Sequence, residues 1–344
     1  MRLLQQPARS ALAVWLWALP LVAMAGPDPI VIAHLGASGY LPEHTLEAKV
    51  LAHAMGADFI EQDVVLTGDG VPIVLHDIYL ESTTDVEQRF PKRARADGRF
   101  YALDFTLAEI RQLSVHERSQ KNPAGDEIAV YPHRFPLGRG HFTVPTLQEE
   151  IELIAGLDAS RGLGTGLYVE LKAPQWHAAQ GHDLAAAVLE VLRRTGYAER
   201  TDRVFLQCFD DATLQRLRHE FKTTLPLIQL IGENDWAEDG SADYDFMRTA
   251  AGLDAIAGYA TGVGPWIPQL LTESADGSWA ATGLAALARQ RGLLVHPYTV
   301  RADDLPPGVK DIDDLHRALF DELGVNGAFT DFPDLTRRFI TARR

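Results

Sequence analysis

The chain has 344 residues, 46% of them apolar and 23% charged, which is the composition of a folded globular protein. Its formal net charge of −15 argues against a nucleic-acid partner, because phosphate backbones are bound by clustered Lys and Arg. An anionic ligand must therefore meet a locally positive site, provided by a metal ion or by a few placed cations.

The N-terminal 25 residues have the pattern of a secretory signal peptide. Two arginines precede the apolar run 11–22, and the small residues Ala23-Met-Ala25 follow it. The run falls short of the roughly 18 residues that a membrane-spanning helix needs, which disfavours a membrane anchor. We expect cleavage after Ala25, export to the periplasm or beyond it, and no stable membrane insertion of the mature protein.

Nine short apolar runs rich in β-branched residues predict strands. They are Ile30–Ala33, Phe59–Val65, Ile73–His76, Leu167–Leu171, Val204–Cys208, Leu227–Ile231, Ala255–Tyr259, Leu293–Pro297 and Gly327–Thr330. Segments with apolar residues three and four apart predict helices between most of these strands. They include Leu46–Met55, Thr146–Leu157, Asp183–Thr195, Ala212–Phe221, Thr282–Gln290 and Ile312–Leu323. This alternation of strands and helices predicts a parallel sheet.

A hairpin accounts for the ninth strand. The segment Leu66–Pro72 is too short for a parallel crossover but fits a hairpin turn, so Ile73–His76 should return antiparallel beside Phe59–Val65. The eight remaining strands predict a (β/α)₈ TIM barrel in one domain, residues 26–344. The alternative is a doubly wound open sheet, but no Gly-rich phosphate loop follows the first strand as that fold would require.

Residues 78–143 form a predicted insertion after the hairpin. The segment is rich in charge, Gly, Pro and aromatic residues, and offers only a weak helix at Leu107–Leu113. Active sites of such barrels lie at the carboxyl ends of the strands, where long loops gather. We expect the insertion to shape substrate entry.

Three carboxylates fall on predicted strands. Glu61 and Asp63 are two residues apart, so their side chains project from one face of the strand, and Glu170 and Lys172 repeat this spacing on a later strand. One acidic pair alone would more commonly be an ion pair or a solvated strand edge. Three carboxylates together suit a hard cation such as Ca²⁺ or Mg²⁺.

Two histidines each close a predicted strand: His34 ends the first strand and His76 ends the returning strand of the hairpin. A lone histidine at either position is more often structural. Pairing in the hairpin, however, brings His76 level with Asp63. Two histidines that flank a metal-bound phosphate are placed to act as general acid and general base.

Seven motifs resemble the glycerophosphodiester phosphodiesterase family, and most closely its bacterial periplasmic branch. They are His34-Leu-Gly-Ala-Ser-Gly-Tyr-Leu-Pro-Glu-His-Thr45, Ile60-Glu-Gln-Asp63, Val74-Leu-His-Asp77, Tyr168-Val-Glu-Leu-Lys172, Leu206-Gln-Cys-Phe-Asp210, Val295-His-Pro-Tyr-Thr-Val300 and Phe329-Thr-Asp-Phe-Pro333. They stand in family order from about residue 30 to residue 340. The resemblance implies hydrolysis of glycerophosphodiesters to sn-glycerol 3-phosphate and an alcohol.

The resemblance also implies roles for individual residues. It makes His34 and His76 the acid and base, Glu61, Asp63 and Glu170 the ligands of one divalent ion, Ca²⁺ or Mg²⁺, Lys172 a phosphate contact, and Glu43 a support behind the site. Phe209 and Trp266 are candidates for the wall of the glycerol pocket, although rim or core packing explains them equally well.

One position departs from the family pattern. The family has Arg directly after the first histidine, where it helps hold the phosphate, and this chain has Leu35. A charge-assisted hydrogen bond contributes about 1.5–3 kcal/mol, so the change bears on activity more than on fold. Arg134 and Arg301 are candidates to replace the lost charge, although either would more commonly be a surface residue.

Two other functions stay open from the sequence. One is a phosphodiesterase that acts on lysophospholipids in the manner of a phospholipase D, and the other is a weakly active or non-catalytic homologue. The sequence does not predict the oligomeric state, the head-group preference or the native metal.

Overall fold

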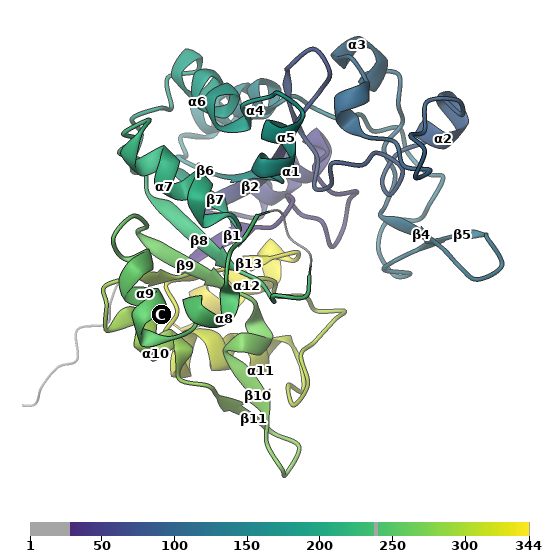
Figure 1. The fold of residues 1–344 in the computed structure, drawn as a ribbon. Helices are drawn as coiled ribbons and strands as arrows, with labels where there is room; N and C mark the ends of the chain where they lie inside the picture. The colour runs from purple at the N-terminus through teal and green to yellow at the C-terminus, as the bar shows by residue number, and fades with distance from the viewer. Residues whose placement is uncertain (1–27, 237–239, 344) are drawn as a thin grey trace, which may run out of the picture.

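The computed structural model describes residues 28–236 and 240–343 (Figure 1). The signal peptide predicted for residues 1–25 lies outside this part of the chain. Within it, no helix is both long enough and apolar enough to cross a membrane.

In the described residues, eight parallel strands follow one another in the order β12-β9-β8-β7-β6-β2-β1-β13. They are β1 (Ile30–Ala33), β2 (Phe59–Leu66), β6 (Gly166–Leu171), β7 (Val204–Cys208), β8 (Leu227–Ile231), β9 (Gly262–Pro265), β12 (Leu294–Val295) and β13 (Gly327–Thr330). A parallel bridge between Val300 and Thr330 links the two ends of this order. The sheet is therefore a nearly closed barrel, and the predicted (β/α)₈ TIM barrel is confirmed.

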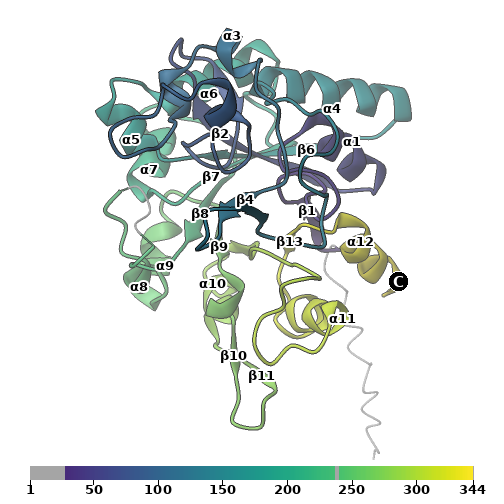
Figure 2. The same cartoon turned by 90° about the vertical axis from the view of Figure 1, so that its right-hand side faces the viewer.

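Helices surround the strands on the outside of the barrel (Figure 2). They are α1 (Leu46–Ala54), α4 (Leu147–Arg161), α5 (Pro174–Ala179), α6 (Leu184–Arg194), α7 (Asp211–His219), α8 (Tyr244–Met247), α9 (Ala250–Ile256), α10 (Leu284–Arg289), α11 (Ile312–His316) with its π-helical continuation Arg317–Glu322, and α12 (Pro333–Ala342). In α6, the buried residues Leu184, Val188, Val191 and Leu192 recur at the spacing of one helix face. The six helices predicted from such spacing are all present, with small differences at their ends.

One predicted strand is wrong. The segment Ala255–Tyr259 is the end of α9 and the turn after it, because the Thr249 side chain caps this helix and Leu253 and Ile256 are buried at helical spacing. The strand in this part of the barrel is β9, Gly262–Pro265. A Cβ atom at Gly262 would lie 2.7 Å from the Leu294 carbonyl oxygen, so the close approach of the neighbouring strand requires glycine there. Glycine carries no apolar side chain, and the strand therefore lacks the usual sequence signal.

The predicted hairpin is confirmed. Strand β3 (Pro72–Val74) runs antiparallel to β2, with Val64 opposite Val74. The predicted register is wrong by one residue, because Leu75, not His76, lies level with Asp63 and donates its N–H to the Asp63 carbonyl over 2.9 Å. The insertion that follows contains α2 (Val86–Arg89), a 3₁₀ turn at Ala102–Asp104, α3 (Leu107–Ile110), and the two-stranded sheet β4 (Ser119–Lys121) and β5 (Glu127–Ala129). Buried apolar side chains of this segment, among them Leu80, Phe105 and Ile110, pack with Val65 and Ile73 of the hairpin. The insertion lies beside the barrel in Figure 1, and the view from that side shows β4 in front of the ring of strands (Figure 2).

Candidate active site

A cavity of about 280 Å³ lies at the carboxyl ends of the barrel strands. Its position follows from its lining: His34, Lys172, Phe209 and Trp266 each come directly after the last residue of β1, β6, β7 and β9. Every site residue predicted from the sequence lines this cavity except Glu43, namely His34, Glu61, Asp63, His76, Glu170, Lys172, Phe209 and Trp266. The barrel thus gathers residues as far apart in the chain as His34 and Trp266, and their roles stay predictions.

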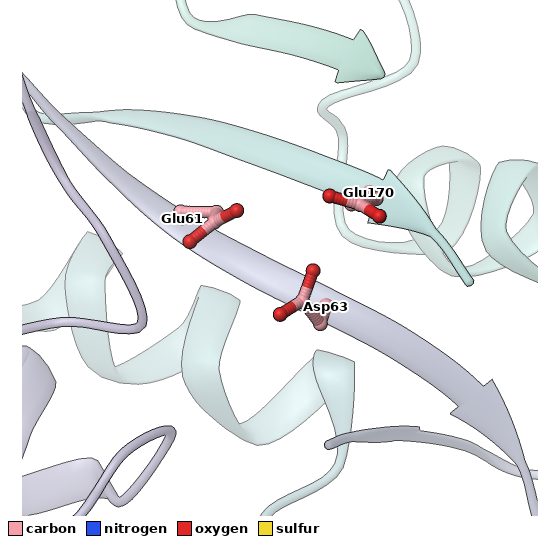
Figure 3. A group of neighbouring side chains, drawn as sticks. All are labelled: Glu61, Asp63 and Glu170. Carbon is pink, nitrogen blue, oxygen red and sulfur yellow. The ribbon is translucent and has the colours of Figure 1, made fainter. Parts of the chain in front are cut away.

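The three acidic side chains meet between two neighbouring strands (Figure 3). Glu61 and Asp63 project from β2, Glu170 projects from β6, and the register places Asp63 opposite Glu170. Each offers an oxygen atom within 4.8 Å of the others, and all three residues are buried. The buried Oδ1 atom of Asp63 has no hydrogen-bond partner in the described part of the chain. Close oxygen ligands with an unpartnered carboxylate oxygen fit a hard divalent cation.

Neighbouring charges shift the pKa values of two of the buried carboxyl groups in opposite directions. Burial and the adjacent carboxylates of Asp63 and Glu170 raise the pKa of Glu61 well above its usual value. Burial would also raise the pKa of Asp63, but the Lys172 ammonium group and the hydrogen bond from His44 lower it well below its ordinary value. The Lys172 Nζ atom also lies 2.8 Å from Glu170 Oε1. The Lys172 ammonium group therefore offsets part of the negative charge of the cluster at Asp63 and Glu170.

His44 and Lys49 orient the Asp63 carboxylate. The Lys49 ammonium group, which can only donate, lies 3.1 Å from Nδ1 of His44, so Nδ1 accepts and the ring proton is on Nε2. His44 Nε2 then donates to Asp63 Oδ2 over 2.9 Å. Burial and the Lys49 charge lower the pKa of His44 to about 4, which agrees with a neutral ring. The other oxygen of Asp63 is left to face the cluster.

His34 is held by a carboxylate through its Nδ1 atom. Nδ1 lies 2.6 Å from Oδ1 of Asp331, the residue directly after β13. Burial would raise the pKa of Asp331, but the neighbouring Arg301 and His34 lower it strongly, so the carboxylate is ionised and accepts the Nδ1 proton. The Nε2 atom, on the other side of the ring, lies 3.9 Å from Glu61 Oε2 and is free to exchange a proton in the cavity.

His76 has the same arrangement. Its Nδ1 atom lies 2.6 Å from Asp77 Oδ1, and Ser82 and Arg118 donate to the other oxygen of Asp77 at 2.7 and 2.8 Å. Arg118 also donates twice to Glu43, at 2.9 and 2.6 Å. Glu43 therefore lies behind the cavity and is linked to His76 through Arg118 and Asp77, and its role stays a prediction.

Aromatic side chains form one wall of the cavity. Trp266 meets Trp236 edge to face with ring centres 5.1 Å apart, and Phe209 meets Tyr298 in the same way at 5.9 Å. The Lys172 Nζ atom lies 5.5 Å from the centre of the Phe209 ring. An apolar wall beside a charged floor suits a small ligand that has both carbon and phosphate groups.

Leu35 keeps a backbone role although it lacks the charge of arginine. Its N–H group donates to Glu61 Oε2 over 2.8 Å, and its buried side chain does not line the cavity. Arg301 does line the cavity, whereas Arg134 is bound to Asp331 and Asp303 behind it. Of the two arginines that the sequence offered as replacements, only Arg301 is in a position to reach a ligand.

Sequence reasoning assigned no role to several residues of the site. Asp77 and Asp331 stand in the quoted motifs, one directly after His76 and the other directly after a strand, and that position was an available signal. Gln207, which donates to Glu61 and Glu170 at 3.0 and 3.3 Å, also stands in a quoted motif. Arg118 lies in the insertion with no local pattern that marks it.

Comparison with known proteins identifies the family of this chain. The model of the glycerophosphoryl diester phosphodiesterase family matches residues 34–335. A glycerophosphodiester phosphodiesterase of Haemophilus influenzae is 43% identical over 328 residues, which cover 91% of this chain and 90% of the relative. One of Treponema pallidum is 36% identical over 359 residues, covering 96% of this chain and 98% of the relative.

A solved structure adds support for the fold. An Oleispira antarctica phosphodiesterase in complex with the product sn-glycerol-3-phosphate superposes with a TM-score of 0.60 at 23% identity, covering 91% of this chain and 97% of the other. The family predicted from the sequence motifs is confirmed by these matches over most of the chain. The chain belongs to the glycerophosphoryl diester phosphodiesterase family and is an enzyme of that class.

Proposed function

We propose that this enzyme hydrolyses glycerophosphodiesters to sn-glycerol 3-phosphate and an alcohol, with the help of one divalent ion, Ca²⁺ or Mg²⁺. The observation that carries the proposal is that three buried carboxylates and two carboxylate-bound histidines line one cavity. The names of the relatives from Haemophilus influenzae and Treponema pallidum support the same activity.

Glu61, Asp63 and Glu170 would hold the ion. When bound, a divalent ion supplies the positive charge that neutralises a phosphate oxygen during displacement at phosphorus. Lys172 and Arg301 line the cavity and add positive charge of their own, which offsets the repulsion between an anionic substrate and an acidic protein. Phe209 and Trp266 give the glycerol or the head group an apolar wall.

The two histidines carry the proton transfers. Because both Nδ1 atoms donate to aspartates, both Nε2 atoms are left for the substrate. One Nε2 accepts the proton of the attacking oxygen, either from water, which gives sn-glycerol 3-phosphate directly, or from the 2-hydroxyl of the substrate, which gives a cyclic phosphate that water opens in a second step. The other gives a proton to the departing alcohol.

Action on lysophospholipids is the less favoured alternative. It would need a free basic or apolar surface beside the mouth of the cavity. The insertion has a basic run at residues 89–95, and two of its arginines are engaged with acids of the same segment: Arg93 pairs with Glu109 and Arg95 pairs with Asp104, both at 2.7 Å. These ion pairs neutralise part of the basic run and so weaken the case for a lipid-binding surface.

The experiment that tests the function is release of sn-glycerol 3-phosphate from a panel of deacylated phospholipids, with and without added Ca²⁺ or Mg²⁺. We expect turnover of glycerophosphocholine and much slower turnover of lysophosphatidylcholine presented in micelles. Preference for the lysophospholipid would favour the alternative instead, and no turnover of any diester with either ion would contradict the proposal.

A separate prediction concerns Leu35. Since Lys172 and Arg301 already line the cavity, the wild type should be active, and Leu35→Arg should raise kcat/KM by about tenfold or less, the effect of one modest charge-assisted contact. Leu35→Met, which adds length without charge, is the control and should change little. A wild type without activity that gains turnover only with Leu35→Arg would instead show a homologue that had lost catalysis.

We also propose that the protein is exported and belongs to the periplasmic branch of the family. The charged start, apolar run and Ala23-Met-Ala25 site of the N-terminus support this. The N-terminal sequence of the mature protein, recovered from a periplasmic extract, tests it.

A further inference from the structure

Two arginines of the insertion bind the aspartates that hold the two histidines of the site. Neither arginine lines the cavity, and no residue of 78–143 is among those that do. Each one instead binds the aspartate that holds a histidine: Arg118 binds Asp77, and Arg134 binds Asp331. The insertion thus contacts the proposed acid and base indirectly, through one aspartate for each histidine.

The two contacts share one geometry. In each aspartate, Oδ1 accepts a hydrogen bond from the histidine Nδ1 over 2.6 Å. The other oxygen, Oδ2, accepts a hydrogen bond from the arginine, over 2.8 Å for Arg118 and 2.7 Å for Arg134. A carboxylate bound at both oxygens cannot rotate without breaking one of the bonds. The direction of the histidine ring therefore depends on the position of the arginine, together with Ser82 at Asp77 and Arg301 at Asp331.

Each arginine is itself held in place by a second acid. Arg118 forms a fork with both oxygens of Glu43, at 2.9 and 2.6 Å. Arg134 binds both oxygens of Asp303, at 2.9 and 3.0 Å, and lies 3.7 Å from the centre of the Tyr131 ring. Only the planar, five-donor guanidinium group can serve two carboxylates in this way, so lysine is not an equivalent replacement.

We propose that the insertion is a clamp that positions both acid/base histidines, with Arg118 and Arg134 as its positioning residues. Docking of residues 78–143 on the barrel would complete the site without contributing to the wall of the cavity. This inference rests on the proposed function, because it assigns the arginines an effect on proton transfer by His76 and His34.

The test compares Arg118→Lys and Arg134→Lys with Arg95→Lys. Arg95 makes a two-bond ion pair with Asp104 in the same insertion, but it contacts neither histidine-bound aspartate. With glycerophosphocholine, kcat should fall by roughly 10–100-fold in Arg118→Lys with little change in KM. Arg134→Lys should lose less, because Arg301 still donates to Asp331 at 2.9 Å. Arg95→Lys should match the wild type.

A second substrate separates positioning from simple loss of folded enzyme. The p-nitrophenyl ester of glycerol 3-phosphate has a leaving group that needs no proton, so it bypasses the general acid. In the variant whose arginine serves the acid histidine, the loss should shrink several-fold or more with this substrate, while the other variant keeps its loss. A smaller folded fraction would lower both rates equally in every variant.

Different results would contradict the clamp and the proposed function. Equal losses on both substrates in both arginine variants, or kcat values like that of Arg95→Lys, would overturn the clamp while leaving the proposed function intact. Retained activity in His76→Ala or His34→Ala, assayed in parallel, would overturn the assignment of that histidine as acid or base, and absence of diester hydrolysis by the wild type would overturn the proposed function itself.

Discussion

Replacing His34 or His76 with alanine should lower kcat for glycerophosphocholine by about 10²–10⁴, the range of general acid or base catalysis. Each ring is held at Nδ1 and presents Nε2 to the cavity, so alanine removes the group that moves the proton. The fold should survive, because both side chains are partly exposed, by 12% for His34 and 38% for His76. Steady-state assays and thermal unfolding of the purified variants measure the two effects.

His219→Ala is the matched control for these variants. His219 ends α7, is exposed, and lies away from the cavity. Its removal should leave kcat unchanged. The double variant His34→Ala/His76→Ala should be little worse than the single variants if acid and base act in one concerted step. Turnover above one tenth of the wild-type rate in either single variant would rule out the assignment of that histidine.

Removal of divalent ions should abolish turnover, and Ca²⁺ or Mg²⁺ should restore it. Without a cation, three buried carboxylates within 4.8 Å of one another face the phosphate, and the repulsion would exceed what Lys172 and Arg301 can offset. Loss of such charge stabilisation corresponds to a fall of at least about 10²–10³ in rate. Chelation, dialysis and stepwise return of each ion provide the measurement, and full activity after thorough metal removal would exclude the metal.

Asp63→Asn gives this prediction a readout that does not depend on turnover. Lys172 and His44 lower the pKa of Asp63, so its ionised form is stabilised in the fold, and the metal-free variant should melt at or below the metal-free wild type. The wild type should gain about 2.7 kcal/mol of stability when the ion is present at a hundred times its Kd, and the variant should gain much less. Glu190→Gln, an exposed carboxylate that pairs with Arg193 on α6, should behave as the wild type. Equal stabilisation of wild type and Asp63→Asn by the ion would remove Asp63 from the ligand set.

The sequence predicted the elements whose signal is local. Strands β1, β7, β8 and β13 agree with their predicted bounds, because each is a short apolar run that is buried in the barrel. Strand β9 was not predicted, because its sequence has no local apolar signal. Its glycines are required by the approach of Leu294 and Leu230 from neighbouring strands, and such contacts between distant segments leave no apolar pattern in the sequence.

By itself, the sequence determined the barrel, the hairpin, the family, and the residues that surround the cavity. These follow from strand periodicity and from motifs at strand ends, because parallel strands bring their carboxyl ends to one face. Only the tertiary structure decided what holds the histidines. The pairs Arg118–Asp77 and Arg134–Asp331 join residues 41 and 197 positions apart, and the position of Arg301 in the cavity was likewise fixed only by the packed barrel. An ion pair depends on distance in space, and no pattern along the chain encodes the distance between an insertion and the barrel it covers.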